Sequence, residues 1–556
     1  MRAVVILASL TLAAPALAAT ARNVTSAPAA ASALASITTA ELAAPIKTLS
    51  SNAYGGRAPT TPGGIKAIHY MRAKFKSFGL EPGWHGKYFQ TVPLTEITAK
   101  PANFTITGHG KTTVLKYLTD EVASTKREQK TVAIKDSPIV FAGFGVDAPE
   151  FHWNDFAGTN VAGKTIIVLV NDPGYYNPTL FHGKHMTYYG RWTYKYEEAA
   201  RQHAAAVLVV HQTGPAGYGW DVVRNSWSGH QFEITRKDKN MGRAGIEGWI
   251  THAAAVKLFK QAGLDFAKLE AKAEKPGFKA VPLGLKLSVT LHSTIEHKKS
   301  HNVIAMLPGR THPDQAIVYS AHWDHLGTNP NLKGDNIFNG AVDNASGSSS
   351  LLALAKAYTL VKPRPARSVI FLSTTSEEQG LLGSEYYTEH PVVPLADTVA
   401  DINMDIMNVY GKTRDLTEIG YGKSQLDPWL AAAAKDEGMT LKPYPHPETG
   451  MFYRTDLLEF VKRGVPGVVA ASGYDYVGKP AGWGARKWAY YFAHNYHHPS
   501  DQYNPHWDLS GQVQQTRALF RLGLDLADSD AWPNWNAGVP FRALRDKQRP
   551  LAASTH

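Results

Sequence analysis

Two segments decide how this chain is interpreted: SAHWDHLG at residues 320–327 and NGAVDNASG at residues 339–347. The first follows an apolar, β-prone run, so it is expected where a buried strand ends and a loop begins. Open α/β sheets place their chemistry at that edge. His322 and Asp324 lie two residues apart, so they face the same side of an extended segment. The simplest joint role is an imidazole metal ligand whose second ring nitrogen is oriented by a carboxylate.

The chain around these segments alternates between strand-like and helix-like patterns. Strands are expected at residues 302–306, 316–319, 368–373, 398–404 and 467–471, and helices at 347–358, around 383–387, at 428–437 and at 509–527. Such alternation predicts an α/β fold, with a mainly parallel or mixed central sheet and helices on both faces.

Further carboxylates and imidazoles stand at the predicted strand ends. Glu377 and Glu378 lie in TSEEQGLLGS, Asp405 closes the strand that ends in NMD, and the paired histidines lie in YHHPSDQ. Two adjacent carboxylates do not easily face one metal, so one is expected as a ligand and the other as a general base. Taken alone, an acidic pair is better explained as the solvated start of a helix, where negative charge meets the dipole.

Together these segments offer two imidazoles and three carboxylates: His322, Asp343, Glu378, Asp405 and one of the paired histidines. Such ligands suit zinc and, less tightly, cobalt or manganese. Five side chains exceed what one catalytic zinc takes, whereas two ions that share a bridging carboxylate use five. Two such ions polarise a carbonyl and activate a water.

Length and composition limit the classes of protein to which the chain could belong. The chain has 556 residues, so two or more folded units are expected. Charged residues make up 19% and hydrophobic ones 44%, which excludes wholesale disorder. The net charge is +11, but Lys and Arg are scattered without a dense basic run, so no nucleic-acid partner is expected.

The N-terminal residues have the pattern of a secretory signal peptide. An apolar core follows one early Arg, and Ala16-Leu17-Ala18 precedes a polar segment, which predicts cleavage after Ala18 or Ala19. No later run is long enough to span a membrane. The chain contains 0 Cys, so it has no disulfide, and any metal site must use histidines and carboxylates. A secreted or periplasmic protein is expected.

A block in the middle of the chain differs from its surroundings in its pattern of residues. It combines strand-like runs with aromatic loops and is expected to be an inserted, smaller β-rich domain. The predicted division is 1–19 signal peptide, 20–136 N-terminal part of the main domain, 137–285 insertion and 286–556 main catalytic domain. His182, His185 and His203 are expected on loops of the insertion and not at a metal.

The segments quoted above resemble, in order and spacing, the secreted two-zinc exopeptidases, a family that includes leucine-type aminopeptidases and glutamate carboxypeptidase. The resemblance extends to Gly55-Gly56-Arg57 and to Tyr453-Arg454-Thr455-Asp456. The insertion, with GFGVDAPE and VAGKTIIVLVNDPG, resembles a protease-associated domain.

The resemblance implies a role for each site residue. Asp343 bridges two zinc ions, His322 and Asp405 complete one zinc site, and Glu378 with His497 completes the other. Glu377 acts as the general base, Asp324 orients His322, and Tyr496 donates a hydrogen bond to the developing oxyanion. The family pattern aligns His497, and not His498, as the ligand. It also implies a cis peptide between Asp343 and Asn344.

These roles imply a dizinc exopeptidase that acts on peptides, with an aminopeptidase as the first interpretation. A carboxypeptidase or dipeptidase of the same family is the alternative, since family members cut from either terminus. A non-catalytic binding protein is disfavoured because every ligand is present. A one-zinc glutaminyl cyclase is disfavoured by the five-ligand set and the insertion.

Overall fold

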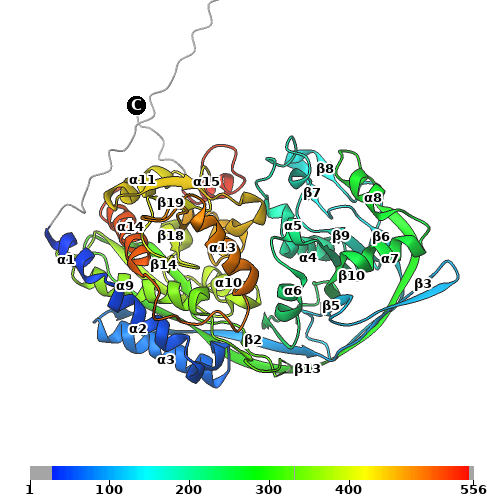
Figure 1. The fold of residues 1–556 in the computed structure, drawn as a ribbon, viewed down its shortest axis with the longest axis horizontal. Coiled ribbons are helices and arrows are strands. Elements are labelled where there is room, and N and C mark those ends of the chain that lie inside the picture. Colours follow the sequence, from blue (N-terminus) through cyan, green and yellow to red (C-terminus); the bar gives the residue numbers. More distant parts are fainter. Residues whose placement is uncertain (1–27, 331, 550–556) are drawn as a thin grey trace, which may run out of the picture.

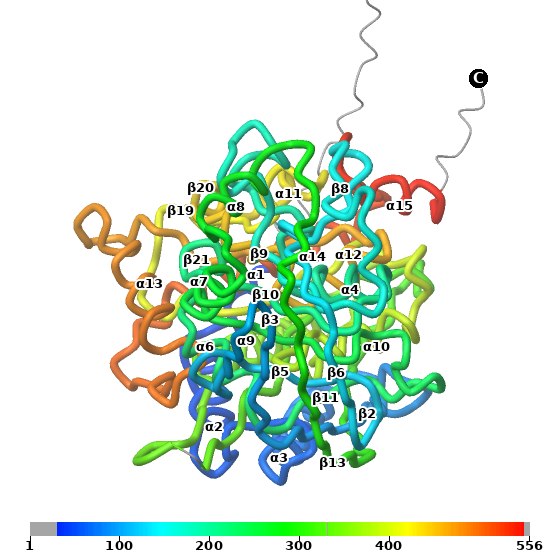
Figure 2. Tube along the Cα trace, turned by 90° about the vertical axis from the view of Figure 1, so that its right-hand side faces the viewer, coloured from blue at the N-terminus to red at the C-terminus, as the bar shows by residue number. Residues whose placement is uncertain are grey.

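Two units lie side by side in the computed structural model, which describes residues 28–330 and 332–549. They are joined by β13 (Val281–Leu307), whose first half pairs in one sheet and whose second half pairs in another (Figure 1). Figure 2 looks onto the second of these units and shows β13 descending along it. The predicted signal peptide, residues 1–19, lies outside the described residues.

The first unit contains a mixed sheet with a parallel centre. Its strands follow the order β11–β2–β13–β17–β14–β18–β21–β19–β20, with β17, β14, β18 and β21 parallel to one another. Their bounds are β2 (Phe89–Ala99), β11 (His230–Ile234), β14 (His312–His322), β17 (Arg367–Thr374), β18 (Thr398–Asn403), β19 (Asp415–Glu418), β20 (Thr440–Pro443) and β21 (Gly467–Ser472), and β1 (Glu81–Pro82) pairs with the end of β13.

Helices cover both faces of this sheet. One face carries α1 (Pro28–Ser36), α2 (Thr39–Leu49), α3 (Pro62–Ser77), α9 (Gly347–Thr359), α11 (Asp427–Asp436) and α14 (Ser510–Ala527), and the other carries α10 (Leu382–Glu389) and α12 (Leu457–Lys462). The buried residues of β14 alternate between the two cores: Ile317 and Tyr319 belong to one, Ala316 and Val318 to the other. The predicted α/β fold with helices on both faces is confirmed.

The second unit has its own mixed sheet, with strand order β4–β3–β13–β6–β9–β10–β12–β5. Its strands are β3 (Phe104–Gly108), β4 (Lys111–Leu115), β5 (Glu121–Ser124), β6 (Thr131–Phe141), β9 (Thr165–Leu169), β10 (Ala206–His211) and β12 (Ile246–Thr251). Its helices are α4 (Trp192–Arg201), α5 (Thr213–Ala216), α6 (Trp220–Ser226), α7 (His252–Gln261) and α8 (Phe266–Ala273).

This second unit begins earlier than the predicted insertion. The boundary expected between residues 136 and 137 falls inside β6, and β3, β4 and β5 pair within the same sheet. One continuous apolar core includes residues from Phe104 to Leu291. We therefore use the term "second unit" for residues 104–291. Within it, β11 leaves the local sheet and pairs with β2 of the first unit.

Several elements are not among those expected from the sequence. Residues 28–36 form α1, and the C-terminal segment includes α15 (Arg542–Gln548). The aromatic stretch before the paired histidines forms α13 (Trp483–His494). Short ribbons are formed by β7 (Asp147–Ala148) with β8 (Trp153–Asn154) and by β15 (Gly327–Thr328) with β16 (Ile337–Phe338).

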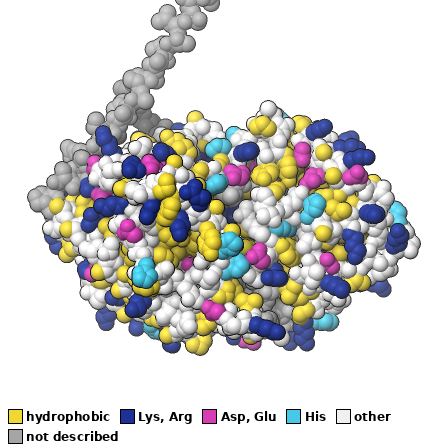
Figure 3. Space-filling view, in the orientation of Figure 1, with side chains coloured by type: hydrophobic (Ala, Val, Ile, Leu, Met, Phe, Trp, Pro, Cys, Tyr) yellow, Lys and Arg dark blue, Asp and Glu magenta, His cyan; other side chains and the backbone are white. Residues whose placement is uncertain are grey.

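The helices of the described residues bear on a membrane span, and one face of the molecule shows how its basic side chains are distributed. No helix among the described residues combines the length and apolarity needed to cross a membrane. On the face seen in Figure 3, Lys and Arg side chains are scattered over both units and interspersed with other types. This distribution agrees with the sequence, which has no dense basic run.

Candidate metal centre

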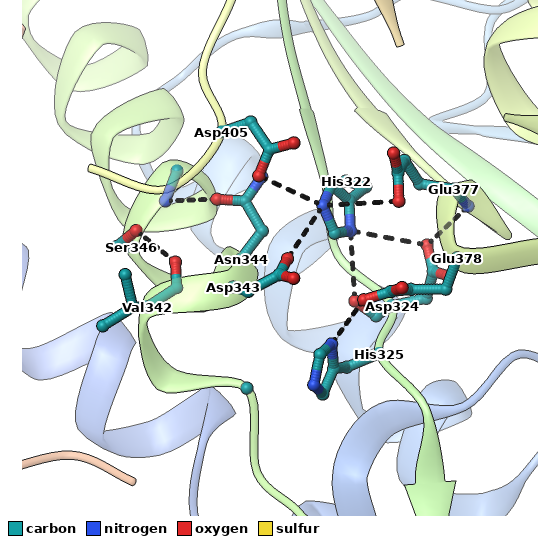
Figure 4. A network of polar contacts seen from close by, with 12 residues as sticks. His322, Asp324, His325, Val342, Asp343, Asn344, Ser346, Glu377, Glu378 and Asp405 are labelled. Carbon is teal, nitrogen blue, oxygen red and sulfur yellow. Dashed lines mark hydrogen bonds and ion pairs between the residues drawn. The ribbon is translucent and has the colours of Figure 1, made fainter. Parts of the chain in front are cut away.

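The carboxyl ends of the central parallel strands bring the predicted site residues together. His322 ends β14, and Figure 4 shows it at the centre of a group of carboxylates. Its Nε2 lies 3.4 Å from Oδ1 of Asp343, 3.5 Å from Oδ1 of Asp405 and 3.8 Å from Oε2 of Glu377. Glu377 follows β17 and Asp405 follows β18, so adjacent strands deliver three of these four side chains.

A second imidazole faces the same group from the opposite side of Asp343. His497 Nε2 lies 3.0 Å from Oε2 of Glu378 and 3.3 Å from Oδ2 of Asp343. Asp343 therefore turns one carboxylate oxygen to His322 and the other to His497. Two half-sites result, each with one imidazole and one further carboxylate, and Asp343 lies between them.

These residues fit a metal site. His322 Nε2 and Asp405 Oδ1 are buried and have no hydrogen-bond partner among the described residues. Candidate ligand atoms of His322, Asp343 and Glu378 lie within 4.8 Å of one another, as do those of His322, Glu377 and Asp405. Nitrogen and carboxylate donors without sulfur suit zinc. Because Glu377 belongs to one of these groups, the distances alone allow it either role, ligand or base.

Burial and mutual charge determine the protonation of these groups in the protein without metal. Burial lowers the pKa of His497, but Glu378 and Asp343 overcome it and raise that pKa to about 10. Burial raises the pKa of Glu378, yet His497 and His325 bring it down to about 2. For Glu377, burial and then the carboxylates of Glu378 and Asp405 raise the pKa well above its usual value, although His322 opposes them.

Asp324 lies beside His322 but contacts it differently from the prediction. Its carboxylate Oδ1 is 4.0 Å from His322 Nδ1, whereas its backbone carbonyl oxygen is 3.2 Å from that nitrogen. The same carboxylate oxygen accepts a hydrogen bond of 3.2 Å from the backbone N–H of Glu377. Here the backbone carbonyl of Asp324 is the nearer partner of the imidazole, and the side chain holds the Glu377 loop.

The loop that carries Asp343 is fixed from two directions. The peptide bond between Asp343 and Asn344 is cis, as the resemblance implies. Asp501 accepts hydrogen bonds from the backbone N–H groups of Val342 and Asp343, at 3.1 and 3.0 Å. Asn344 donates to the carbonyl of Met404 at 2.9 Å, which ties this loop to the residue before Asp405. Asp501 lies in the YHHPSDQ segment and was assigned no role in the sequence analysis.

Arg57 joins the two loops that carry His322 and Asp343, a role that sequence reasoning missed. Its guanidinium is fully buried and donates to the backbone carbonyls of Trp323, Asn339 and Gly340, at 2.9, 2.5 and 2.9 Å. These acceptors lie far from Arg57 in the sequence, and no local residue pattern marks a backbone carbonyl as an acceptor. The motif Gly55-Gly56-Arg57 was the only signal that could have drawn attention to it.

Three neighbours complete the surroundings of Glu378 and His497. His325 Nδ1 lies 2.5 Å from Oε1 of Glu378, so this histidine contacts a proposed ligand directly. The ring of Tyr496 stacks on that of His497, with centroids 4.0 Å apart. From the second unit, Ser226 Oγ lies 3.3 Å from His497 Nδ1. Ser226 carried no signal in the sequence.

The remaining histidines lie apart from this centre. His498 Nε2 lies 3.2 Å from Asp221 Oδ2 of the second unit, and His498 is in neither candidate metal group. Within residues 28–330 and 332–549, the two candidate groups also omit His182, His185 and His203.

Comparison with known proteins links this site to a peptidase family. Residues 302–521 match the family model described as Peptidase family M28. Aminopeptidase NAALADL1 of Mus musculus is 37% identical over 139 residues, which cover 24% of this chain and 17% of that protein. Leucine aminopeptidase 2 of Trichophyton equinum is 29% identical over 208 residues, covering 35% of this chain and 38% of that protein.

The match thus spans less than two thirds of either curated relative. Among solved structures, the aminopeptidase from Aneurinibacillus sp. strain AM-1 is 18% identical, with a TM-score of 0.49 and coverage of 89% of this chain and 95% of that one. The family match includes His322, Asp343, Glu378, Asp405 and His497, all five members of the proposed ligand set. In the part that carries the candidate metal centre, residues 302–521, the chain is thus similar to peptidase family M28.

Proposed function

We propose that this chain is a metallo-exopeptidase that uses two zinc ions and releases residues from the N-terminus of peptides. The observation that carries the proposal is the placement of Asp343, with one oxygen toward His322 and the other toward His497. A carboxylate between two half-sites is what a pair of ions sharing one bridge requires. The family match and the aminopeptidase relatives support the choice of reaction.

In this proposal, His322 and Asp405 would hold one ion, His497 and Glu378 would hold the other, and Asp343 would serve both. Cobalt or manganese could replace zinc at such ligands. When bound, zinc ions supply Lewis acidity, which polarises the scissile carbonyl and lowers the pKa of a water.

Glu377 and Tyr496 then act on the substrate. The Glu377 carboxylate accepts a proton from the attacking water and returns it to the leaving amine. Its side chain is 10% exposed, so it reaches the cavity while remaining shielded from solvent. The Tyr496 phenol, which lines the same cavity, donates a hydrogen bond to the oxyanion. The N–H of Glu377 donates to Asp324, which keeps the base in place.

The cavity favours cleavage near a peptide end. It has a volume of about 400 Å³ and is lined by Glu377, Tyr496 and His497 of the first unit and by residues of the second. A space of this size accommodates the end of a peptide and not a folded chain. We propose that the second unit, whose sequence resembles a protease-associated domain, restricts access in this way and donates no ligand.

A carboxypeptidase or dipeptidase is the second candidate. The observation that favours it is a pair of arginines in the same cavity, Arg191 and Arg454, which could receive a terminal carboxylate. We also propose export from the cytoplasm, on the strength of the N-terminal signal-peptide pattern.

The test is the hydrolysis of matched substrates by zinc-loaded protein. A peptide with a free amine and an amidated carboxyl end should be cleaved, and the same peptide with an acetylated amine and a free carboxyl end should not. Elemental analysis of the same sample should give two zinc ions per chain. The aminopeptidase assignment fails if only the N-acetylated peptide with a free carboxylate is cleaved, and the peptidase assignment fails if neither is.

A further inference from the structure

His325 is a buried histidine beside the candidate metal centre that does not belong to the proposed ligand set. It lies in the loop that follows β14, and its side chain is 0% exposed. Its Nδ1 lies 2.5 Å from Oε1 of Glu378, and Figure 4 shows the ring directed toward that carboxylate. Its Nε2 is buried and has no hydrogen-bond partner among the described residues. The carboxylate of Glu378 is therefore the one polar partner that the described residues offer to this ring.

The two oxygens of Glu378 contact two different imidazoles. Oε2 lies 3.0 Å from Nε2 of His497, and Oε1 lies 2.5 Å from Nδ1 of His325. The two rings are nearly perpendicular, at 80°, and their centroids are 5.7 Å apart. Nε2 of His497 also faces Asp343, at 3.3 Å, whereas within the described residues His325 pairs with Glu378 alone. The candidate ligand atoms of this half-site thus gather at Oε2, and Oε1 faces away from them.

The chemistry of the contact determines where the proton of His325 lies. A carboxylate that binds a metal cation is ionised, so it accepts hydrogen bonds and cannot donate one. Nδ1 of His325 must then carry the proton and donate the hydrogen bond to Oε1 of Glu378. This bond fixes the rotation of the carboxylate and occupies one of its oxygens. Glu378 is left with Oε2 as the atom that it can offer to an ion beside His497.

Gly340 makes room for the ring of His325. Its φ of +53° lies in the left-handed region that glycine adopts readily. A Cβ at this position would lie 2.6 Å from Cγ and from Cδ2 of His325, and 2.2 Å from the backbone oxygen of Asp343. Both distances are too short for any side chain. Glycine at residue 340 therefore allows the imidazole to pack directly against the loop that carries the shared carboxylate.

From these contacts we propose that His325 is a positioning residue of the metal centre, which holds Oε1 of Glu378 so that only Oε2 binds the ion beside His497. The ring does not touch substrate, because it is buried and is not among the described residues that line the cavity. It acts through Glu378, since a hydrogen bond from a neighbouring group orients a metal ligand and raises the affinity of the site. The inference deepens the proposed function and rests on it for the identity of the metal.

Two substitutions separate the hydrogen bond from the volume of the ring. His325→Leu fills a similar space without a donor, whereas the amide nitrogen in His325→Asn takes the place of Nδ1. In zinc competition with a chelator, His325→Leu should weaken one of the two dissociation constants by about tenfold or more. The other constant should not change, because the carboxylate that His325 contacts belongs to the His497 half-site. His325→Asn should restore the affinity.

Cobalt provides a second measurement, which loss of packing alone would not alter. The visible absorption of bound cobalt depends on the number and kind of atoms that contact the ion, and cobalt suits these ligands. Without the bond from His325, Oε1 of Glu378 is free to bind as well. His325→Leu should therefore change the spectrum at two equivalents of cobalt, and His325→Asn should give the wild-type spectrum.

His211→Leu is the matched control, because His211 is also buried and hydrogen-bonded, to the carbonyl of Tyr218 in the second unit at 3.0 Å. It should leave the zinc constants and the cobalt spectrum unchanged. The proposal is overturned if His325→Leu binds both ions like the wild type, or if it weakens both equally. It is also overturned if His325→Asn loses one ion as His325→Leu does, which would make His325 a ligand. If His325→Leu does not fold, His325→Ala decides, because it also lacks a donor.

These measurements keep the inference separate from the peptidase proposal, since neither uses a peptide. If no peptide is cleaved but His325→Leu weakens one of two bound zinc ions, the peptidase function fails and the role of His325 stands. If peptides are cleaved and His325→Leu binds both ions like the wild type, only the role of His325 is overturned. A wild type that binds no zinc overturns both.

Discussion

Ser226 of the second unit places its hydroxyl 3.3 Å from Nδ1 of His497, the ring nitrogen that faces away from Asp343 and Glu378. A partner at the second nitrogen fixes the orientation of a ligating imidazole. We therefore predict that Ser226→Ala weakens zinc binding by about tenfold, measured by competition with a chelator. Ser228→Ala, two residues away, is the control and should bind zinc normally. Equal zinc affinity in both variants would show that the hydroxyl has no such role.

The second prediction separates the two adjacent glutamates. Glu377→Gln should lower kcat by about 10²–10⁴-fold while both metal ions remain bound, because its carboxylate is proposed to move a proton. Glu378→Gln should instead reduce the metal content, since Oε2 of Glu378 faces His497 at 3.0 Å. Elemental analysis and kcat measured on the same preparations decide. Loss of metal from Glu377→Gln would make it a ligand, a role that its distance to His322 allows.

The sequence was sufficient to predict the central strands and the residues that gather at their ends. Strand runs of the right length end at His322, before Glu377 and before Asp405, and parallel strands align their carboxyl ends at one edge. The helix that starts at Gly347 was equally clear from its apolar pattern. The local periodicity of apolar residues encodes these strands and this helix, so they can be predicted from a single sequence.

Contacts between distant segments could not be predicted in the same way. Arg57 reaches carbonyls more than 260 residues away, and a backbone acceptor leaves no mark on residue type. Ser226 contacts His497 across 271 positions. The length of β13 was also missed, because its polar residues 296–301 look like a loop although they continue the pairing with β2. Such features depend on how the two units meet, which local patterns do not record.

Asn344 is predicted to act through stability and metal binding. Its side chain donates to the carbonyl of Met404 at 2.9 Å and accepts from the N–H of Gly347 at 2.8 Å. Asn344→Ala removes both bonds in a buried place, which should cost about 1–3 kcal/mol of unfolding free energy and lower zinc affinity more than it raises KM. Denaturant unfolding and zinc titration test this. Asn536→Ala, which removes a hydrogen bond far from the site, should leave zinc affinity unchanged.

Removal of metal is predicted to destabilise the first unit. The carboxylates of Asp343, Glu377 and Asp405 surround His322. Without metal cations, the imidazole relieves only part of the repulsion between these carboxylates. Ligand that binds only the folded state at a thousand times its Kd adds about 4 kcal/mol of stability. Calorimetric scans should therefore show a lower Tm in chelator, restored by zinc. The recovery should saturate at two equivalents, and saturation at one would contradict the shared bridge.

The last prediction concerns Glu121, a buried carboxyl group in β5 whose two oxygens have no hydrogen-bond partner among the described residues. Burial, followed by the charge of Asp120, raises its pKa from 4.5 to about 8. Below the unfolded value both states carry the proton, so Glu121 then adds no pH dependence. As the pH rises toward 8, only the unfolded state has released the proton, and the unfolding free energy falls by about 1.4 kcal/mol per pH unit.

Glutamine cannot ionise, so Glu121→Gln should be spared this loss. Its Tm should match that of the wild type near pH 4.5 and exceed it increasingly up to about pH 8, where the difference levels off. Thermal unfolding of both proteins across this range gives the measurement. Glu81→Gln, at an exposed position, serves as the control and should show a constant offset. A pH-independent difference for Glu121→Gln would mean that this carboxyl group is not held neutral in the folded protein.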